Sequence, residues 1–120
     1  MEAIDREFQM TVIPNMSALS FSDLTINSLQ CKVFRNEIEI ELTNLEFSAL
    51  LYLAQQPGRV FTKEQIYQHL YPDELTGEIN NIIYCLIRSL RKKLEPDPRH
   101  PKYIHMVRGV GYKFEPLSEE

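Results

Sequence analysis

Short apolar stretches alternate with polar breaks between Ser17 and Leu42. The apolar residues form four groups: Leu19 and Phe21; Leu24 and Ile26; Val33 and Phe34; and Ile38, Ile40 and Leu42. The breaks contain turn-forming residues and fall at Ser22-Asp23, Asn27-Ser28 and Arg35-Asn36-Glu37. A period near two, interrupted by turn residues, predicts about four short antiparallel strands.

The apolar spacing then changes to three and four residues, which predicts helices. Thr43 followed by Glu46 is a capping-box pattern, in which each side chain satisfies a backbone amide at the start of a helix. Pro57-Gly58 ends this first helix. Thr62 and Gln65 repeat the pattern and begin a second, shorter helix, after a short extended segment. All four capping residues are therefore expected to be structural.

A third and longest helix is predicted at about 77–95, with Thr76 or a near neighbour as its N-cap. Its apolar stripe consists of Ile79, Ile82, Ile83, Leu86, Ile87, Leu90 and Leu94. Its opposite face carries Asn80, Asn81, Tyr84, Cys85, Arg88, Arg91 and Lys92. Three prolines after the helix prevent it from continuing, because proline lacks an amide hydrogen.

Two final strands, Tyr103–Val107 and Tyr112–Phe114, flank the segment Arg108-Gly109-Val110-Gly111. Glycine allows the positive φ angles of a tight hairpin. The elements together predict an α+β fold, a winged helix-turn-helix with an N-terminal four-stranded antiparallel sheet, three helices and a C-terminal β-hairpin wing. The expected organisation is a linker or N-terminal arm at 1–15, the winged-helix domain at 16–116 and an acidic tail at 117–120.

Charge is divided unevenly along the chain. The formal net charge of −4 at pH 7 by itself argues against a polyanionic partner. Residues 77–114, however, hold eight Lys or Arg against three Asp or Glu, a net of +5, whereas residues 1–76 hold five against eleven. A cationic run on a helix is most often only a solvated face. The basic hairpin that follows favours another interpretation, because a cationic helix and a cationic wing can meet two adjacent grooves of DNA.

The remaining reactive residues form no recognisable catalytic or metal site. Cys31 and Cys85 show neither a disulfide framework nor metal-ligand spacing, and the three histidines are scattered. No Ser/His/Asp, Cys/His or paired-carboxylate motif is present, and no Gly-rich phosphate loop follows a strand. We therefore expect no enzyme activity, no metal, no cofactor and no small-molecule substrate. The absence of a long apolar stretch and the cysteine usage favour a cytoplasmic protein without membrane contact.

Several motifs follow one another in the order of a known family. The stretch LTNLEFSALLYLAQQPGRVFTKEQI is followed by IRSLRKKLEPDP, PKYI and VRGVGYKF. Over about residues 17–115 the chain resembles the DNA-binding effector domain of OmpR/PhoB-type response regulators. The resemblance implies a bacterial transcription regulator of a two-component system. A receiver domain normally precedes this domain, so the chain is either an excised effector domain or a stand-alone one.

The resemblance also implies a way of binding double-stranded DNA, with the third helix in the major groove and the wing, about 103–114, in the adjacent minor groove. We expect base contacts from Asn81, Tyr84, Cys85 and Arg88. Phosphate contacts are expected from Asn80, Ser89, Arg91 and Lys92. The wing contributes Arg108 and Lys113. The loop between the second and third helices is implied to contact RNA polymerase through Asp73, Glu74, Leu75 and Thr76. Two domains are implied to bind direct repeats as a tandem homodimer.

Three positions depart from the family pattern. The family often has Asp at the position of Tyr84, a second Arg at that of Ser89 and Thr at that of Met106. Loss of an arginine at 89 removes a bidentate guanine contact, which is commonly worth about 1–3 kcal/mol of discrimination. These departures and the acidic first half of the chain leave an alternative open, a winged-helix protein-interaction module with weak or no DNA binding. Asn81 and Cys85 likewise fit either a base contact or an ordinary structural role.

Overall fold

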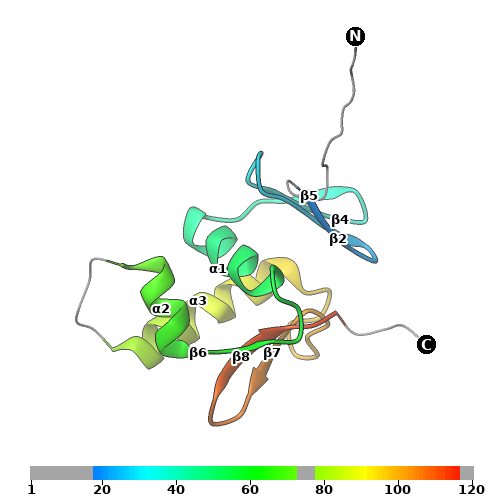
Figure 1. Ribbon diagram of the computed structural model, residues 1–120. Coiled ribbons are helices and arrows are strands. Elements are labelled where there is room, and N and C mark those ends of the chain that lie inside the picture. Colours follow the sequence, from blue (N-terminus) through cyan, green and yellow to red (C-terminus); the bar gives the residue numbers. More distant parts are fainter. Residues whose placement is uncertain (1–17, 73–77, 117–120) are drawn as a thin grey trace.

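The protein is described by a computed structural model covering residues 18–72 and 78–116 (Figure 1). A four-stranded antiparallel sheet of order β2-β3-β4-β5 comes first, made of Ala18–Phe21, Leu24–Asn27, Lys32–Arg35 and Ile38–Ile40. One row of paired residues crosses all four strands and packs on the core, namely Leu19, Ile26, Val33 and Ile40. The predicted N-terminal sheet is therefore confirmed.

Three helices follow, α1 (Asn44–Ala54), α2 (Lys63–Leu70) and α3 (Ile79–Leu94). Both predicted capping boxes are present at the starts of α1 and α2. The helix α3 begins two residues later than predicted, at Ile79, and the side chain of its N-cap residue, Glu78, makes no capping hydrogen bond. The alternative cap, Thr76, lies outside the described residues.

A second sheet of order β6-β8-β7 contains Val60–Thr62, Gly111–Phe114 and Ile104–Val107. The antiparallel pair β7–β8 is the predicted wing, and β6 attaches it to the segment between α1 and α2. A Cβ atom on Gly111 would lie 1.9 Å from the carbonyl oxygen of Phe61, so the close approach of the paired strands β6 and β8 requires glycine.

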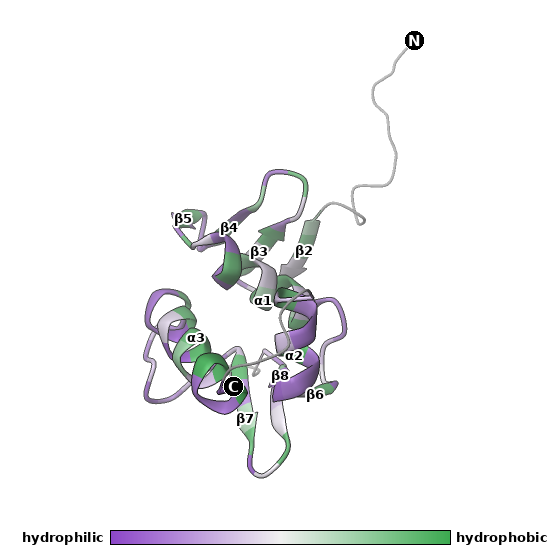
Figure 2. Cartoon of the chain, turned by 90° about the vertical axis from the view of Figure 1, so that its left-hand side faces the viewer, coloured by the Kyte–Doolittle hydropathy of each residue, from purple (hydrophilic) through white to green (hydrophobic). Residues whose placement is uncertain are grey.

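The core lies where α1 and α3 meet the two sheets. It includes the predicted inner positions of α3, of which Ile83, Ile87, Leu90 and Leu94 are fully or almost fully buried. Figure 2 shows α3 with mixed hydrophobic and hydrophilic positions and α2 as mainly hydrophilic. Packing of the apolar stripe of α3 against the core stabilises this helix, and its opposite side is left free for a partner.

Two polar links join the first sheet to the end of α3 and the beginning of the wing. Arg35 of β4 donates a hydrogen bond to the carbonyl oxygen of Leu94, one of the acceptors left open at a helix C-terminus. Asp23 accepts a hydrogen bond from the Tyr103 hydroxyl and pairs with Lys102 at 3.4 Å. The N-terminal sheet thereby holds the two elements that form the candidate site.

Candidate nucleic-acid interface

Exposed residues at three- and four-residue steps form one continuous face on α3. It contains most of the predicted contact residues, Asn80, Asn81, Tyr84, Cys85, Arg88 and Lys92. Tyr84 is 55% exposed although its ring is large and aromatic, so this helix keeps an apolar contact surface open to solvent. Cys85 is also exposed, with its Sγ 3.8 Å from Oδ1 of Asn81. The alternative of a buried structural role for Cys85 is therefore wrong.

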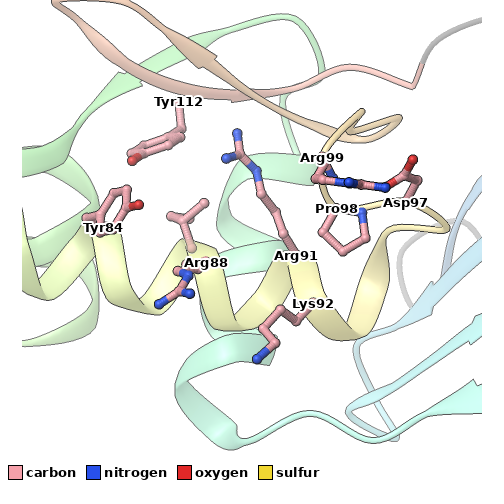
Figure 3. Close-up of a pocket in the computed structure, with 9 residues that line it drawn as sticks. Tyr84, Arg88, Arg91, Lys92, Asp97, Pro98, Arg99 and Tyr112 are labelled. Atoms are coloured by element: carbon pink, nitrogen blue, oxygen red, sulfur yellow. The ribbon is translucent and has the colours of Figure 1, made fainter.

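A groove of about 440 Å³ separates α3 from the wing (Figure 3). Its residues come from α3, from the loop after α3 and from β8: Tyr84, Ile87, Arg88, Arg91, Lys92, Asp97, Pro98, Arg99 and Tyr112. Four of these side chains are cationic and one is anionic. An excess of positive charge over aromatic walls suits an anionic, partly planar ligand such as a nucleic acid strand.

Arg91 joins the two walls of this groove. Its Nε and Nη2 atoms donate hydrogen bonds to the carbonyl oxygen of Ile104 in β7, at 3.3 and 3.1 Å. The guanidinium carbon also lies 5.7 Å from the ring centre of Tyr112 in β8. Burial raises the pKa of Tyr112, although the charge of Arg91 opposes this shift, so the phenol stays neutral. Arg91 thus has a structural role that the sequence pattern did not indicate, while its phosphate contact stays a prediction.

Ser89 is not part of the exposed face. Its hydroxyl donates a hydrogen bond to Oε2 of Glu46 in α1, and the residue is half-buried. A serine hydroxyl has a single proton to donate, and a phosphate oxygen only accepts. In the domain without DNA this hydrogen bond occupies the Ser89 donor, and the phosphate contact of Ser89 stays a prediction.

The wing presents one exposed arginine and two exposed apolar side chains near its tip. Arg108 precedes Gly109, whose φ of +79° is favourable for glycine and strained for other residues. Met106 is 57% exposed and Val110 is 49% exposed. Lys113 is half-buried and forms an ion pair with Glu115 at 2.8 Å. Arg108 is therefore better placed than Lys113 to reach a partner.

The loop after α3 adds groove residues that sequence analysis did not single out. Arg99 lies beside Asp97, with a separation of 3.8 Å between Nε and Oδ1. Glu95 is 3% exposed, and its carboxylate accepts backbone amides from residues 102, 103 and 104. The excess of basic residues in this segment was a signal for Arg99. No sequence signal marks Glu95. Its partners are backbone amides, which every residue type except proline provides.

Comparison with known proteins places this architecture in a family. The model described as transcriptional regulatory protein, C terminal, matches residues 37–114, well over half of the chain. The chain belongs to this family. VanR of Enterococcus faecium is 38% identical to it over 101 residues, which cover 84% of this chain and 44% of VanR. The chain spans about two fifths of the length of the curated relatives that it matches.

Solved structures of family members have the same fold. DrrB of Thermotoga maritima, described as an OmpR/PhoB homolog, superposes with a TM-score of 0.75 at 33% identity, covering 82% of this chain and 44% of DrrB. The DNA-binding domain of Klebsiella pneumoniae RstA, crystallised in complex with the RstA box, gives 0.74 at 28% identity, covering 83% and 98%. The chain is therefore an OmpR/PhoB-type winged-helix effector domain, and its family is one of DNA-binding transcription regulators, not of enzymes.

Other sequence-based expectations fall partly outside the structure. The residues expected to contact RNA polymerase, Asp73, Glu74, Leu75 and Thr76, lie outside the described residues. Among the residues that are described, no helix is long and apolar enough to cross a membrane. The same part of the chain contains no cluster of three His, Cys, Asp or Glu side chains suited to a metal ion.

Proposed function

We propose that this domain reads specific double-stranded DNA sequences with α3 in the major groove and the wing in the adjacent minor groove, and so regulates transcription. The observation that carries the proposal is the cationic groove between α3 and the wing. In DNA, a sugar–phosphate backbone lies between the major groove and the adjacent minor groove. With α3 in one groove and the wing in the other, this backbone must pass between α3 and the wing. The groove offers cations at that place, namely Arg88, Arg91, Lys92 and Arg99.

The face of α3 supports a division between base readout and phosphate contact. Arg88 lies at its centre, flanked one turn away by Tyr84 and Lys92. An arginine in the major groove hydrogen-bonds guanine, and an exposed tyrosine ring packs against a thymine methyl group. Lys92, nearer the end of α3, suits the backbone, as Arg108 suits a narrow and electronegative minor groove. Asn80, Asn81 and Cys85 complete the contact surface nearer the helix N-terminus.

Larger assemblies form part of the same proposal. The curated relatives are more than twice as long as the region that matches this chain. Two copies bind direct repeats in tandem, and the segment from 73 to 76 contacts RNA polymerase. In this arrangement the isolated domain recognises a half-site, and pairing of two copies supplies the affinity of the complete regulator.

Selection of bound duplexes from a random DNA library tests the proposal. The wild-type domain is expected to enrich one motif, repeated about one helical turn apart when two copies bind. The double variant Arg88→Ala/Arg108→Ala should fail to enrich that motif. A matched double variant, Lys32→Ala/Arg59→Ala, removes the same charge outside the groove and should retain the enrichment. Failure of the wild type to enrich any sequence would favour the alternative, a protein-interaction module.

A further inference from the structure

A buried carboxylate connects the first turn of α1 to the side of α3 next to the candidate DNA-binding face. Glu46 is only 3% exposed. Its Oε1 accepts the backbone amide of Thr43 at 2.9 Å and the Lys93 ammonium at 2.8 Å, while its Oε2 accepts the Ser89 hydroxyl. One carboxylate therefore holds the start of α1 and two residues of α3.

This carboxylate is well suited to act as a fixed point. Burial by itself raises the pKa of Glu46, but hydrogen bonds from Lys93, Ser89 and the Thr43 amide lower it overall. The group is therefore an anion at neutral pH, and a buried anion strongly favours the arrangement that keeps its donors in place. The capping box also fixes the side chain in one orientation relative to α1.

The two α3 partners determine how the helix is turned. Ser89 and Lys93 are four residues apart, so they lie on the same side of α3, one turn apart. Two anchors along one side fix both the rotation of a helix about its axis and its position along that axis. Ser89 directly follows Arg88, and Lys93 directly follows Lys92. A further groove of about 190 Å³ is lined by neighbouring residues of α3, namely Cys85, Arg88, Ser89 and Lys92.

We propose that Glu46 is a positioning residue for DNA recognition, and that Lys93 serves Glu46 and not a DNA phosphate. Through Ser89 and Lys93, Glu46 holds α3 in the rotation that presents Arg88 and Tyr84 to base edges. Of the adjacent lysines in the basic run, only Lys92 is then available to the DNA backbone. This inference rests on the proposed function, because it assigns roles within the same interface.

Salt dependence of binding separates the two lysines. Each neutralised phosphate contributes about 0.9 to the slope of log affinity against log salt concentration. Fluorescence anisotropy with the selected duplex should show that Lys92→Met reduces this slope by about 0.9. Lys93→Met should leave the slope unchanged and weaken binding about tenfold, since a misplaced contact loses affinity without releasing fewer ions. Lys32→Met, on the exposed surface of β4, controls for simple loss of charge. A slope reduced equally by Lys93→Met would overturn the proposal.

Discrimination between sequences provides a second readout. Lys93→Met and Ser89→Ala should weaken binding to the selected duplex while leaving affinity for a scrambled duplex unchanged. Equal losses on both duplexes would overturn the proposal, because positioning matters only where bases are read. Lys93→Arg should restore discrimination, since it keeps a donor and a charge near Glu46.

A third measurement does not require DNA. Urea unfolding of Glu46→Gln, Lys93→Met and the double variant should show non-additive losses of stability, because the two residues stabilise one contact. Additive losses would mean that Glu46 does not hold α3 through Lys93. If selection recovers no preferred duplex, the proposed function is refuted. The unfolding measurements would still decide whether Glu46 and Lys93 stabilise one contact between α1 and α3.

Discussion

The guanidinium of Arg91 in α3 donates two hydrogen bonds to the backbone carbonyl of Ile104 in the wing. A side chain of the predicted recognition helix is thereby attached directly to the first strand of the hairpin. The two elements that we place in neighbouring DNA grooves are held at a set separation before any DNA binds. Such preorganisation lowers the conformational cost of binding.

Replacing Arg91 should affect both stability and binding. Arg91→Ala removes two hydrogen bonds from a charged donor, and we expect a loss of about 1.5–3 kcal/mol in the free energy of unfolding. Arg91→Lys should recover little of this, because a lysine does not provide two fixed donors that converge on one carbonyl oxygen. Urea unfolding measures the change. Unchanged stability combined with weaker DNA binding would mean that Arg91 acts only as a phosphate contact.

Removing the Glu95 carboxylate should destabilise the connection from α3 to the wing. Glu95→Ala leaves three backbone amides without their acceptor, two of them in buried residues. At about 1–3 kcal/mol for each buried unsatisfied donor, we expect a total loss of about 3 kcal/mol. Glu95→Gln should lose less, since its amide oxygen still accepts. Glu39→Ala, at an exposed strand position, is the control and should unfold like the wild type.

Two wing glycines should differ in their tolerance of alanine. In Gly111→Ala the new methyl group would overlap the backbone of Phe61, so we expect a loss of about 3 kcal/mol or more. In Gly109→Ala no atom lies within 4 Å of the new group, and only the positive φ opposes it, at a cost of about 1 kcal/mol. Thermal unfolding of the two variants gives the comparison. Equal losses would contradict the close approach of Gly111 to the backbone of Phe61.

The contact between Asp23 and Tyr103 should contribute to acid sensitivity. Partial burial raises the pKa of Asp23, but hydrogen bonds from Tyr103 and its own backbone amide, with the charge of Lys102, lower it below 3.8. A lowered pKa in the folded state stabilises the fold above that value, and this stability is lost as pH falls through the folded pKa. Urea unfolding between about pH 5 and pH 2 should therefore depend less on pH in Asp23→Asn than in the wild type. Parallel curves would exclude this contribution.

Arg108 and Arg88 should give different binding signatures. Loss of a minor-groove or phosphate contact in Arg108→Ala should weaken binding to all duplexes similarly and reduce the salt slope by about 0.9. Arg88→Ala should weaken binding to the selected duplex by about 1–3 kcal/mol and relax preference at one base position. Anisotropy titrations with single-base duplex variants distinguish the two. The same signature for both residues would contradict the division into base and backbone contacts.

The sequence indicated most of the fold because its signals are local. The capping pairs Thr43 with Glu46 and Thr62 with Gln65 lie three residues apart, and the α3 stripe repeats within a few turns. The sequence pattern predicts the start of α3 two residues too early, because the N-cap residue Glu78 makes no side-chain hydrogen bond to the helix. A helix start of this kind has no characteristic residue type.

The candidate site was less predictable, because several of its residues act through distant parts of the chain. Ser89 lies on the border of the polar face by periodicity, and only the fold brings Glu46 close enough to accept a hydrogen bond from its hydroxyl. Arg91 is a residue type that commonly contacts phosphate, yet its guanidinium donates hydrogen bonds to a backbone carbonyl oxygen of the wing. Exposure of Tyr84, Cys85 and Arg88 followed directly from the helical period, so these assignments needed no long-range information.

The pairing of β6 with β8 bears on the order in which the domain forms during synthesis. Residues 60–62 pair with residues 111–113, about fifty positions later in the chain. Pairing of segments so distant in sequence is slow to form and cannot begin before the later segment has been made. A nascent chain that already contains all three helices therefore still lacks its wing and the strand that supports it. The domain would acquire its capacity to bind a partner in one late step, once residues 111–113 have been made and have paired with β6.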